Sequence, residues 1–146
     1  MSVYEKVMEF KNKYSSTMAF RIKKHCKIIE EHLNPNEEVC YAFTGQKNQK
    51  SYDIISTYVL VLTNKRLLVA RKRLLFGYFF HSITPDLFND IKVKSNIIWG
   101  RVKIDTVKEV VYISNISKKA LKEIETEVTE HMMNNKKKYI GKKGNE

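Results

Sequence analysis

The middle of the chain, from Glu38 to Ile113, has the pattern of short β-strands joined by tight turns. Thr57 to Thr63 is a run of β-branched and aromatic residues, which are typical of strands. Arg66 to Ala70 follows after only two residues. This spacing predicts a tight hairpin with Asn64 in the left-handed conformation, which asparagine tolerates. Whatever else the chain forms, it has to form a sheet.

The same pattern continues on both sides of this hairpin. Ile91 and Val93 alternate with Lys92 and Lys94, which predicts a half-buried strand with one face in water. The predicted strands are Val39–Thr44, Thr57–Thr63, Arg66–Ala70, Tyr78–Ile83, Ile91–Lys94, Ile98–Asp105 and Val107–Ile113. Seven strands with short turns indicate an antiparallel meander that curls into a barrel or a sandwich.

Helical spacing flanks the strands at both ends. Apolar residues recur at i, i+4, i+7 and i+11 in two sets, which are Val3, Val7, Phe10 and Tyr14, then Ile22, Cys26, Ile29 and Leu33. Because serine and threonine between the sets are good N-caps, we predict two amphipathic helices. Their apolar stripe has to pack on the barrel or on a second copy. A third helix is predicted over Ile116–Met133.

Beyond Asn134 the chain has no apolar periodicity, and its last eleven residues carry five basic side chains and one acidic. Like charges repel along such a segment, so we predict a disordered basic tail. The expected organisation is an N-terminal helical extension over 1–33, a domain over 34–134 and the tail over 135–146.

The chain is strongly basic, with a formal net charge of +11 and a pI near 9.6. Such a charge favours polyanionic partners. Lysine outnumbers arginine 22 to 5, so codon composition is an alternative source of the charge. Two cysteines without a secretory h-region indicate a reducing cytoplasm. The longest purely apolar run, Tyr58 to Leu62, is too short to span a bilayer.

Three motifs together resemble a known family. The hairpin Val59–Ala70 contains Thr-Asn-Lys-Arg between two apolar strands, and Ile91–Ile104 carries Lys94, Ser95, Trp99 and Gly100 in matching places. Asn115–Lys118 is similar to that family's helix entry. These motifs resemble bacterial pleckstrin-homology (PH) domains of the YokE-like group, over roughly 35–133. The family's turn glycine is Asn96 here, and asparagine tolerates the same backbone conformation.

The resemblance implies an α+β fold. It is a PH-like bent antiparallel β-sandwich or barrel of about seven strands, capped by a C-terminal helix and here preceded by amphipathic helices. No catalytic constellation is visible, because the four histidines stand apart and no HExxH, CxxC or glycine-rich phosphate loop is present. We therefore expect no enzyme, no cofactor and no metal.

Turn parity predicts where a ligand would bind, because successive turns of a meander alternate between the two ends of the sheet. Turns over 45–56, 71–77 and 105–108 share one end, where the resemblance also implies headgroup binding. The predicted anion or membrane-binding residues are Lys47, Lys50, Arg71, Lys72, Arg73 and Lys108. The predicted membrane tip is Leu74, Leu75 and Phe76.

An alternative explanation of this end stays open. Leu75 and Phe76 would then begin a strand, and the basic loop would simply be solvated. Asp53 and Asp105 at the same end would weaken a phosphate site.

The functional hypothesis is a non-enzymatic cytoplasmic binding module for a protein partner or an anionic membrane surface. In the second case it would sit peripherally at the inner face of the membrane. One alternative is a nucleic-acid-binding small β-barrel that uses Tyr41, Tyr52, Tyr58 and Tyr78 for stacking. Another is a structural assembly protein and homo-oligomer that pairs through its N-terminal helices.

Overall fold

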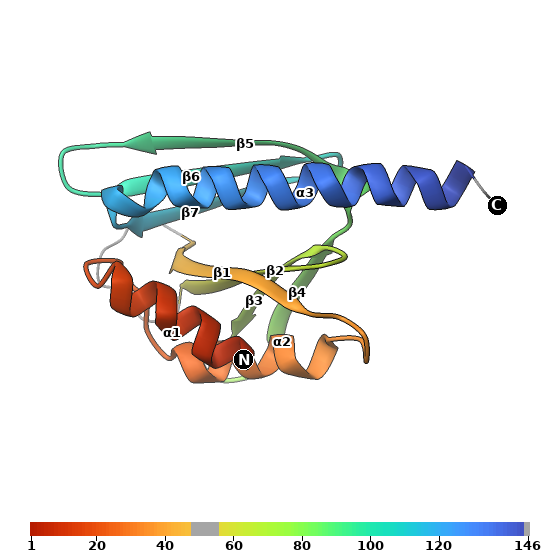
Figure 1. The fold of residues 1–146 in the computed structure, drawn as a ribbon. Coiled ribbons are helices and arrows are strands. Elements are labelled where there is room, and N and C mark those ends of the chain that lie inside the picture. Colours follow the sequence, from red (N-terminus) through yellow and green to blue (C-terminus); the bar gives the residue numbers. More distant parts are fainter. Residues whose placement is uncertain (48–55, 145–146) are drawn as a thin grey trace.

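The computed structural model describes residues 1–47 and 56–144 of the chain (Figure 1). The helices are α1 (Val3–Lys13), α2 (Ile22–His32) and α3 (Leu121–Gly144), with short 3-10 turns at Pro85–Leu87 and Lys118–Ala120. The strands are β1 (Val39–Gln46), β2 (Thr57–Thr63), β3 (Leu67–Lys72), β4 (Tyr78–Ile83), β5 (Phe88–Ser95), β6 (Gly100–Thr106) and β7 (Val110–Ile116). The two N-terminal helices and the seven predicted strands are confirmed.

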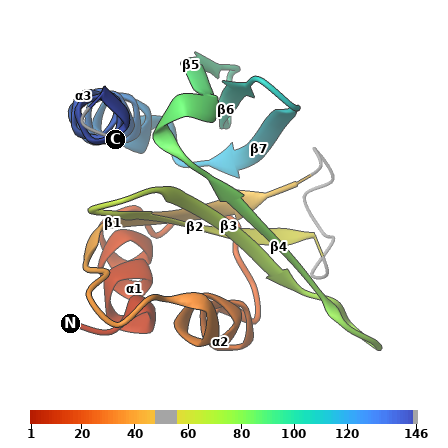
Figure 2. The same cartoon turned by 90° about the vertical axis from the view of Figure 1, so that its right-hand side faces the viewer.

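The strands form one antiparallel sheet in the order β4-β3-β2-β1-β7-β6-β5. β1 and β7 pair only through Gln46 and Ser114, so the sheet bends sharply there. Figure 2 shows the result as two layers, with β1 to β4 below and β5 to β7 above. The predicted bent antiparallel sandwich with a C-terminal helix is confirmed.

The main core lies between the two layers and is closed by α3. Ile124, Val128 and Met132 of α3 are fully buried there. The start of α3 approaches β6 at Gly100, where an added Cβ would lie 2.7 Å from a methyl carbon of Leu121. A larger residue at position 100 would therefore force the Leu121 side chain to move.

A second core lies between the outer face of the first layer and the helices α1 and α2 (Figure 2). Val7 and Ile29 pack there against Val59, Val61 and Leu68, all without exposed surface. The apolar stripe of the N-terminal helices therefore packs on the chain's own sheet. A stripe buried in this way is not free to pair with a second copy.

An ion pair joins the segment between α2 and β1 to the β2–β3 turn. The guanidinium of Arg66 donates to both carboxylate oxygens of Glu37, each at 2.9 Å, and to the carbonyl of His32 at 2.9 Å. Burial by itself raises the pKa of Glu37, but hydrogen bonds from Arg66 and the Thr63 hydroxyl outweigh it and leave the pKa lowered. Arg66 is thus a structural residue, unlike the exposed Lys65 beside it.

Two predicted turn conformations are wrong. Among the described residues only Arg21, Asn115 and Gly77 have positive φ, so neither Asn64 nor Asn96 is left-handed. Their side chains act instead. The Asn64 Oδ1 accepts from the Glu38 amide. The Asn96 Oδ1 accepts from the amides of Ile98 and Trp99.

The disordered tail predicted from residue 135 is also wrong, because α3 continues to Gly144. Asn135 is buried, and its Nδ2 donates to the Thr63 carbonyl at 3.2 Å. The Lys136 ammonium donates to the Phe88 carbonyl at 3.3 Å. These contacts attach the helix where apolar periodicity gave no signal. No helix in the described part of the chain is long and apolar enough to cross a membrane.

The second core generates a stability prediction. Ile29→Ala should lower the free energy of unfolding by about 2–5 kcal/mol, because it empties space at a fully buried position. Deleting residues 2–33 should abolish cooperative unfolding, since it exposes the apolar outer face of the first layer. Urea titration followed by circular dichroism measures both. Met133→Ala at an exposed site is the control, with an effect within about 0.5 kcal/mol. Unchanged unfolding of the deletion variant would show that the helices are a free appendage.

Candidate functional site

The predicted convergence of turns at one end of the first layer is present. Gln46 pairs with Thr57, and Lys72 pairs with Tyr78, so the β1–β2 and β3–β4 turns leave the sheet at the same end. The β6–β7 turn approaches from the second layer, because Glu109 lies 2.9 Å from the Nε2 of His81 on β4. The β2–β3 turn lies at the opposite end, as parity requires.

Arg71 and Lys72 do not form one cluster with each other. β3 runs to Lys72 rather than ending at Ala70 as predicted, so their side chains alternate across the sheet. Arg71 faces the interior, with its guanidinium 5.9 Å from the ring centre of Tyr58. Burial raises the pKa of Tyr58, and the positive charge of Arg71 opposes that shift.

The backbone of Lys72 is fastened to α2. Its amide donates to the Nδ1 of His25 at 2.7 Å, and its carbonyl accepts from the guanidinium of Arg21 at 3.4 Å. His25 is fully buried. Burial first, and then the charge of Arg21, lowers the pKa of His25 to about 4, although a backbone hydrogen bond with Phe20 raises it. The imidazole is therefore a neutral acceptor near pH 7. These contacts fix the end of β3 before the turn begins.

The β3–β4 turn projects a basic and apolar tip into solvent (Figure 2). The Arg73 amide donates to the Gly77 carbonyl at 3.2 Å, and Gly77 has a φ of 72°, which favours glycine. Between them Leu74, Leu75 and Phe76 are 54%, 80% and 84% exposed. Because β4 starts only at Tyr78, Leu75 and Phe76 do not begin a strand.

Two other predicted site residues, Lys47 and Lys108, lie where the β6–β7 turn approaches the first layer. Lys47 lines a recess of about 340 Å³ with Tyr58, Phe79 and Glu109. Lys108 is exposed in the neighbouring turn. The carboxylate of Glu109 opposes anion binding in this recess. The exposed tip of the β3–β4 turn is therefore the better candidate for an anion or membrane site. Lys50, Tyr52 and Asp53 lie outside the described residues.

The tyrosines proposed for base stacking do not form one surface. Tyr58 is buried in the main core, and the Tyr41 hydroxyl donates to the Glu123 carboxylate at 2.9 Å. Tyr78 stacks edge-on with His32. Among the described residues no group of three or more His, Cys, Asp and Glu side chains is arranged to hold a metal ion.

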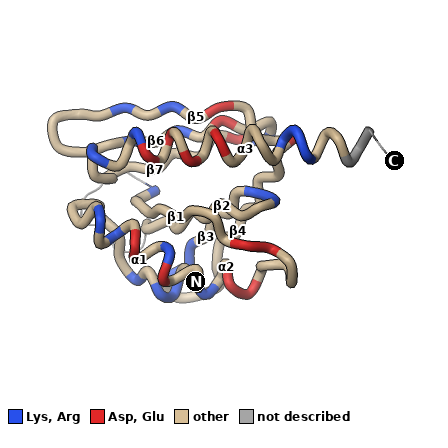
Figure 3. The backbone as a smooth tube through the Cα atoms, viewed as in Figure 1, with Lys and Arg blue, Asp and Glu red and all other residues tan. Residues whose placement is uncertain are grey.

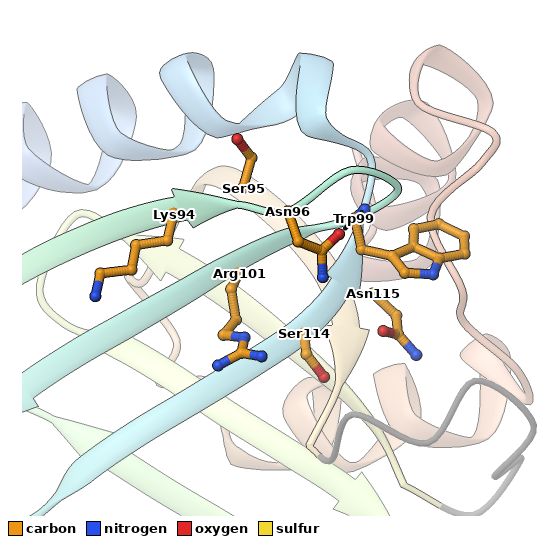
Figure 4. Close-up of a pocket in the computed structure, with 8 residues that line it drawn as sticks. Lys94, Ser95, Asn96, Trp99, Arg101, Ser114 and Asn115 are labelled. Carbon is orange, nitrogen blue, oxygen red and sulfur yellow. Dashed lines mark hydrogen bonds between the residues drawn. The ribbon is translucent and has the colours of Figure 1, made fainter.

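Sequence reasoning missed a second group of surface residues, at the β5–β6 turn. Ile97 and Ile98 are highly exposed there, and Lys94 and Arg101 border a recess beside Trp99 (Figure 4). The signal was present in the alternation of basic residues along both strands. From sequence alone this alternation predicts only a solvent-exposed face of the strands, because a single sequence does not give the cross-strand register.

With this geometry in place, comparison with known proteins identifies the family. The family described as "Bacterial PH domain" matches residues 33–130, so the chain belongs to it. PH domains typically serve as non-catalytic binding modules.

Solved structures with a pleckstrin-homology domain are also similar. A DUF1696 family protein from Shewanella loihica PV-4 has 17% sequence identity and a TM-score of 0.48, covering 75% of this chain and 88% of its own. A pleckstrin homology domain from Shewanella amazonensis SB2B has 17% identity and a TM-score of 0.44, covering 70% and 79% respectively. No curated protein matches the chain.

The buried His25 makes stability depend on pH. Its pKa is about 4 in the folded chain against 6.5 ordinarily, so the unfolded chain binds the proton first as the pH falls. This histidine should therefore cost about 2 kcal/mol of folding free energy between pH 7 and pH 5. Urea titrations at the two pH values measure the loss. In His25→Gln, whose amide oxygen can still accept from Lys72, that loss should disappear, whereas His131→Gln should retain it. Equal pH dependence in all three proteins would contradict the assignment.

Proposed function

We propose that the chain is a peripheral binding module that attaches to anionic membrane surfaces through the tip of the β3–β4 hairpin. One observation carries the proposal: Leu75 and Phe76 are at least four-fifths exposed at the end of a hairpin, directly after Arg73. Large apolar side chains on a free surface of this kind are typical of interaction sites.

The tip combines the two forces that hold peripheral proteins on bilayers. Burying one leucine and one phenylalanine side chain at the interface would contribute about 1.5–3 kcal/mol each. Each basic residue near an anionic leaflet adds about 1 kcal/mol, fading over a Debye length. Arg73 and Lys72 supply that charge from the base of the tip. Added salt weakens the electrostatic contribution to membrane binding but not the apolar contribution, so measurements at different salt concentrations separate the two.

The rigid base of the hairpin supports this function. The contacts of Lys72 with His25 and Arg21 hold the end of β3 against α2, so the base of the hairpin loses little conformational freedom on binding. Exposed Lys47 and Lys108 lie at the same end of the sandwich and add positive charge near the same leaflet.

Flotation with vesicles of phosphatidylcholine, alone or mixed with phosphatidylglycerol, tests the proposal. The unmodified chain should float only with the anionic vesicles at low salt. Lys72→Glu with Arg73→Glu should weaken binding at least tenfold, since attraction is replaced by repulsion. Leu75→Ser with Phe76→Ser should remove the part of the binding that survives physiological salt.

The matched control reverses two exposed lysines at the opposite end, Lys65→Glu with Lys137→Glu. Asn135, two residues from Lys137, donates to the carbonyl of Thr63, the last residue of β2 before the β2–β3 turn, so Lys137 lies at the same end as Lys65. Arg71 and Arg66 are left unchanged, because one is half-buried against Tyr58 and the other pairs with buried Glu37. Equal losses at both ends would indicate diffuse attraction instead of a site. Absence of vesicle binding at low salt would overturn the proposal and favour a protein partner.

A further inference from the structure

The outer face of β5, β6 and β7 carries like charges directly opposite one another. Lys92 of β5 pairs in register with Lys103 of β6, and Lys94 pairs with Arg101. Like charges that face each other across a sheet destabilise it, whereas opposite charges would stabilise it. Two neighbouring cross-strand pairs of this kind, called rungs below, therefore lower the stability of the fold.

Within residues 1–47 and 56–144, no ion pair accounts for these cations. Among the described residues none of the four has a carboxylate within the 4.0 Å limit of an ion pair, and three of the four are exposed. The next rung on the same face is Asp90 with Asp105, which ends the cationic patch. Figure 3 shows this separation of charge along β5, with blue segments toward the β5–β6 turn and red toward the start of the strand.

The patch is hollowed by two neighbouring recesses that share Lys94 and Arg101. The first, of about 230 Å³, is bordered by Asn96 and Trp99 (Figure 4). The Oδ1 of Asn96 accepts from two backbone amides, at 2.9 and 2.6 Å, which leaves its NH2 group to donate to a ligand. The second recess, of about 330 Å³, extends along the rung of Lys92 and Lys103.

An exposed aromatic ring completes the second recess. Tyr112 of β7 pairs in register with Lys103 and is 53% exposed. An aromatic ring next to cations on an open sheet can stack on a base while the cations contact phosphates. Along one strand, Lys92 and Lys94 lie about 7 Å apart, which gives the patch the form of two parallel rows of charge.

We propose that this face of β5, β6 and β7 binds single-stranded nucleic acid. The cationic rows would follow the phosphodiester backbone, and Tyr112 would stack on a base. The broad face of a three-stranded sheet is too wide to enter the groove of a duplex, so single strands fit it better. The face is turned away from the first layer, and the β3–β4 hairpin projects from the opposite part of the molecule (Figure 2). The inference is therefore independent of the membrane proposal.

Fluorescence anisotropy with labelled oligo-dT and oligo-U measures this binding. Lys92→Glu with Lys94→Glu places a carboxylate opposite Lys103 and another opposite Arg101. It should weaken oligonucleotide binding at least tenfold and flatten the dependence of log K on log salt by about 1.4, because each lost phosphate contact removes about 0.7. The same variant should melt at an unchanged or higher temperature, since like-charge rungs become opposite-charge rungs. A fall in melting temperature would show that the lysines serve the fold and would contradict the proposal.

Two further variants separate a site from net charge. Lys23→Glu with Lys24→Glu makes the same change in charge at exposed positions of α2, on the far side of the first layer, and should leave affinity within about twofold. Tyr112→Ser should weaken single strands about tenfold and duplex DNA much less. Equal losses in the α2 control, or no oligonucleotide binding at low salt, would overturn the proposal. So would loss of vesicle flotation, in place of oligonucleotide binding, on reversal of Lys92 and Lys94.

Discussion

The first layer of the sandwich is apolar on both faces, and this constraint determines most of the structure. All seven residues of β2 are buried, although successive side chains point to opposite sides of a sheet. Each face therefore needs its own cover. The second layer and α3 cover the inner face, and α1 with α2 cover the outer one. The N-terminal helices are in this sense part of the domain's core.

This burial leaves few places for exposed charge and function. With both faces of the first layer covered, the β3–β4 turn is a part of it that reaches solvent freely (Figure 2). The helix that covers the outer face also holds the end of β3, because His25 and Arg21 contact the backbone of Lys72. In the described part of the chain the second layer is covered on its inner side, and its outer face is a broad sheet surface that carries cations.

Much of the fold could be predicted because its signals are local. Periods of 3.6 and 2 along the chain gave the N-terminal helices and the seven strands, and turn parity gave the end at which the turns meet. The contacts made by Asn135 and Lys136 could not be predicted, since they depend on tertiary partners at Thr63 and Phe88. The prediction of a left-handed backbone at Asn64 and Asn96 was wrong because an asparagine side chain can also stabilise a turn by accepting hydrogen bonds from backbone amides.

The candidate site was predicted less completely than the fold. If β3 ended at Ala70, as the sequence predicts, Arg71 and Lys72 would lie together in a loop. The strand continues for these two residues instead, so their side chains point to opposite faces of the sheet. The cationic rungs depend on the register between β5 and β6, which a single sequence does not specify. The predicted tip from Leu74 to Phe76 is an exposed surface in the structure.

The most direct test of membrane docking uses the chain's single tryptophan, Trp99. Trp99 lies at the β5–β6 turn (Figure 4), and that turn belongs to the second layer, away from the β3–β4 tip (Figure 2). Brominated lipids in anionic vesicles quench tryptophan only where the side chain enters the bilayer. The unmodified chain should bind without quenching, and a Phe76→Trp, Trp99→Phe variant should bind and be strongly quenched. Quenching of Trp99 in the unmodified chain, with none at position 76, would contradict the account.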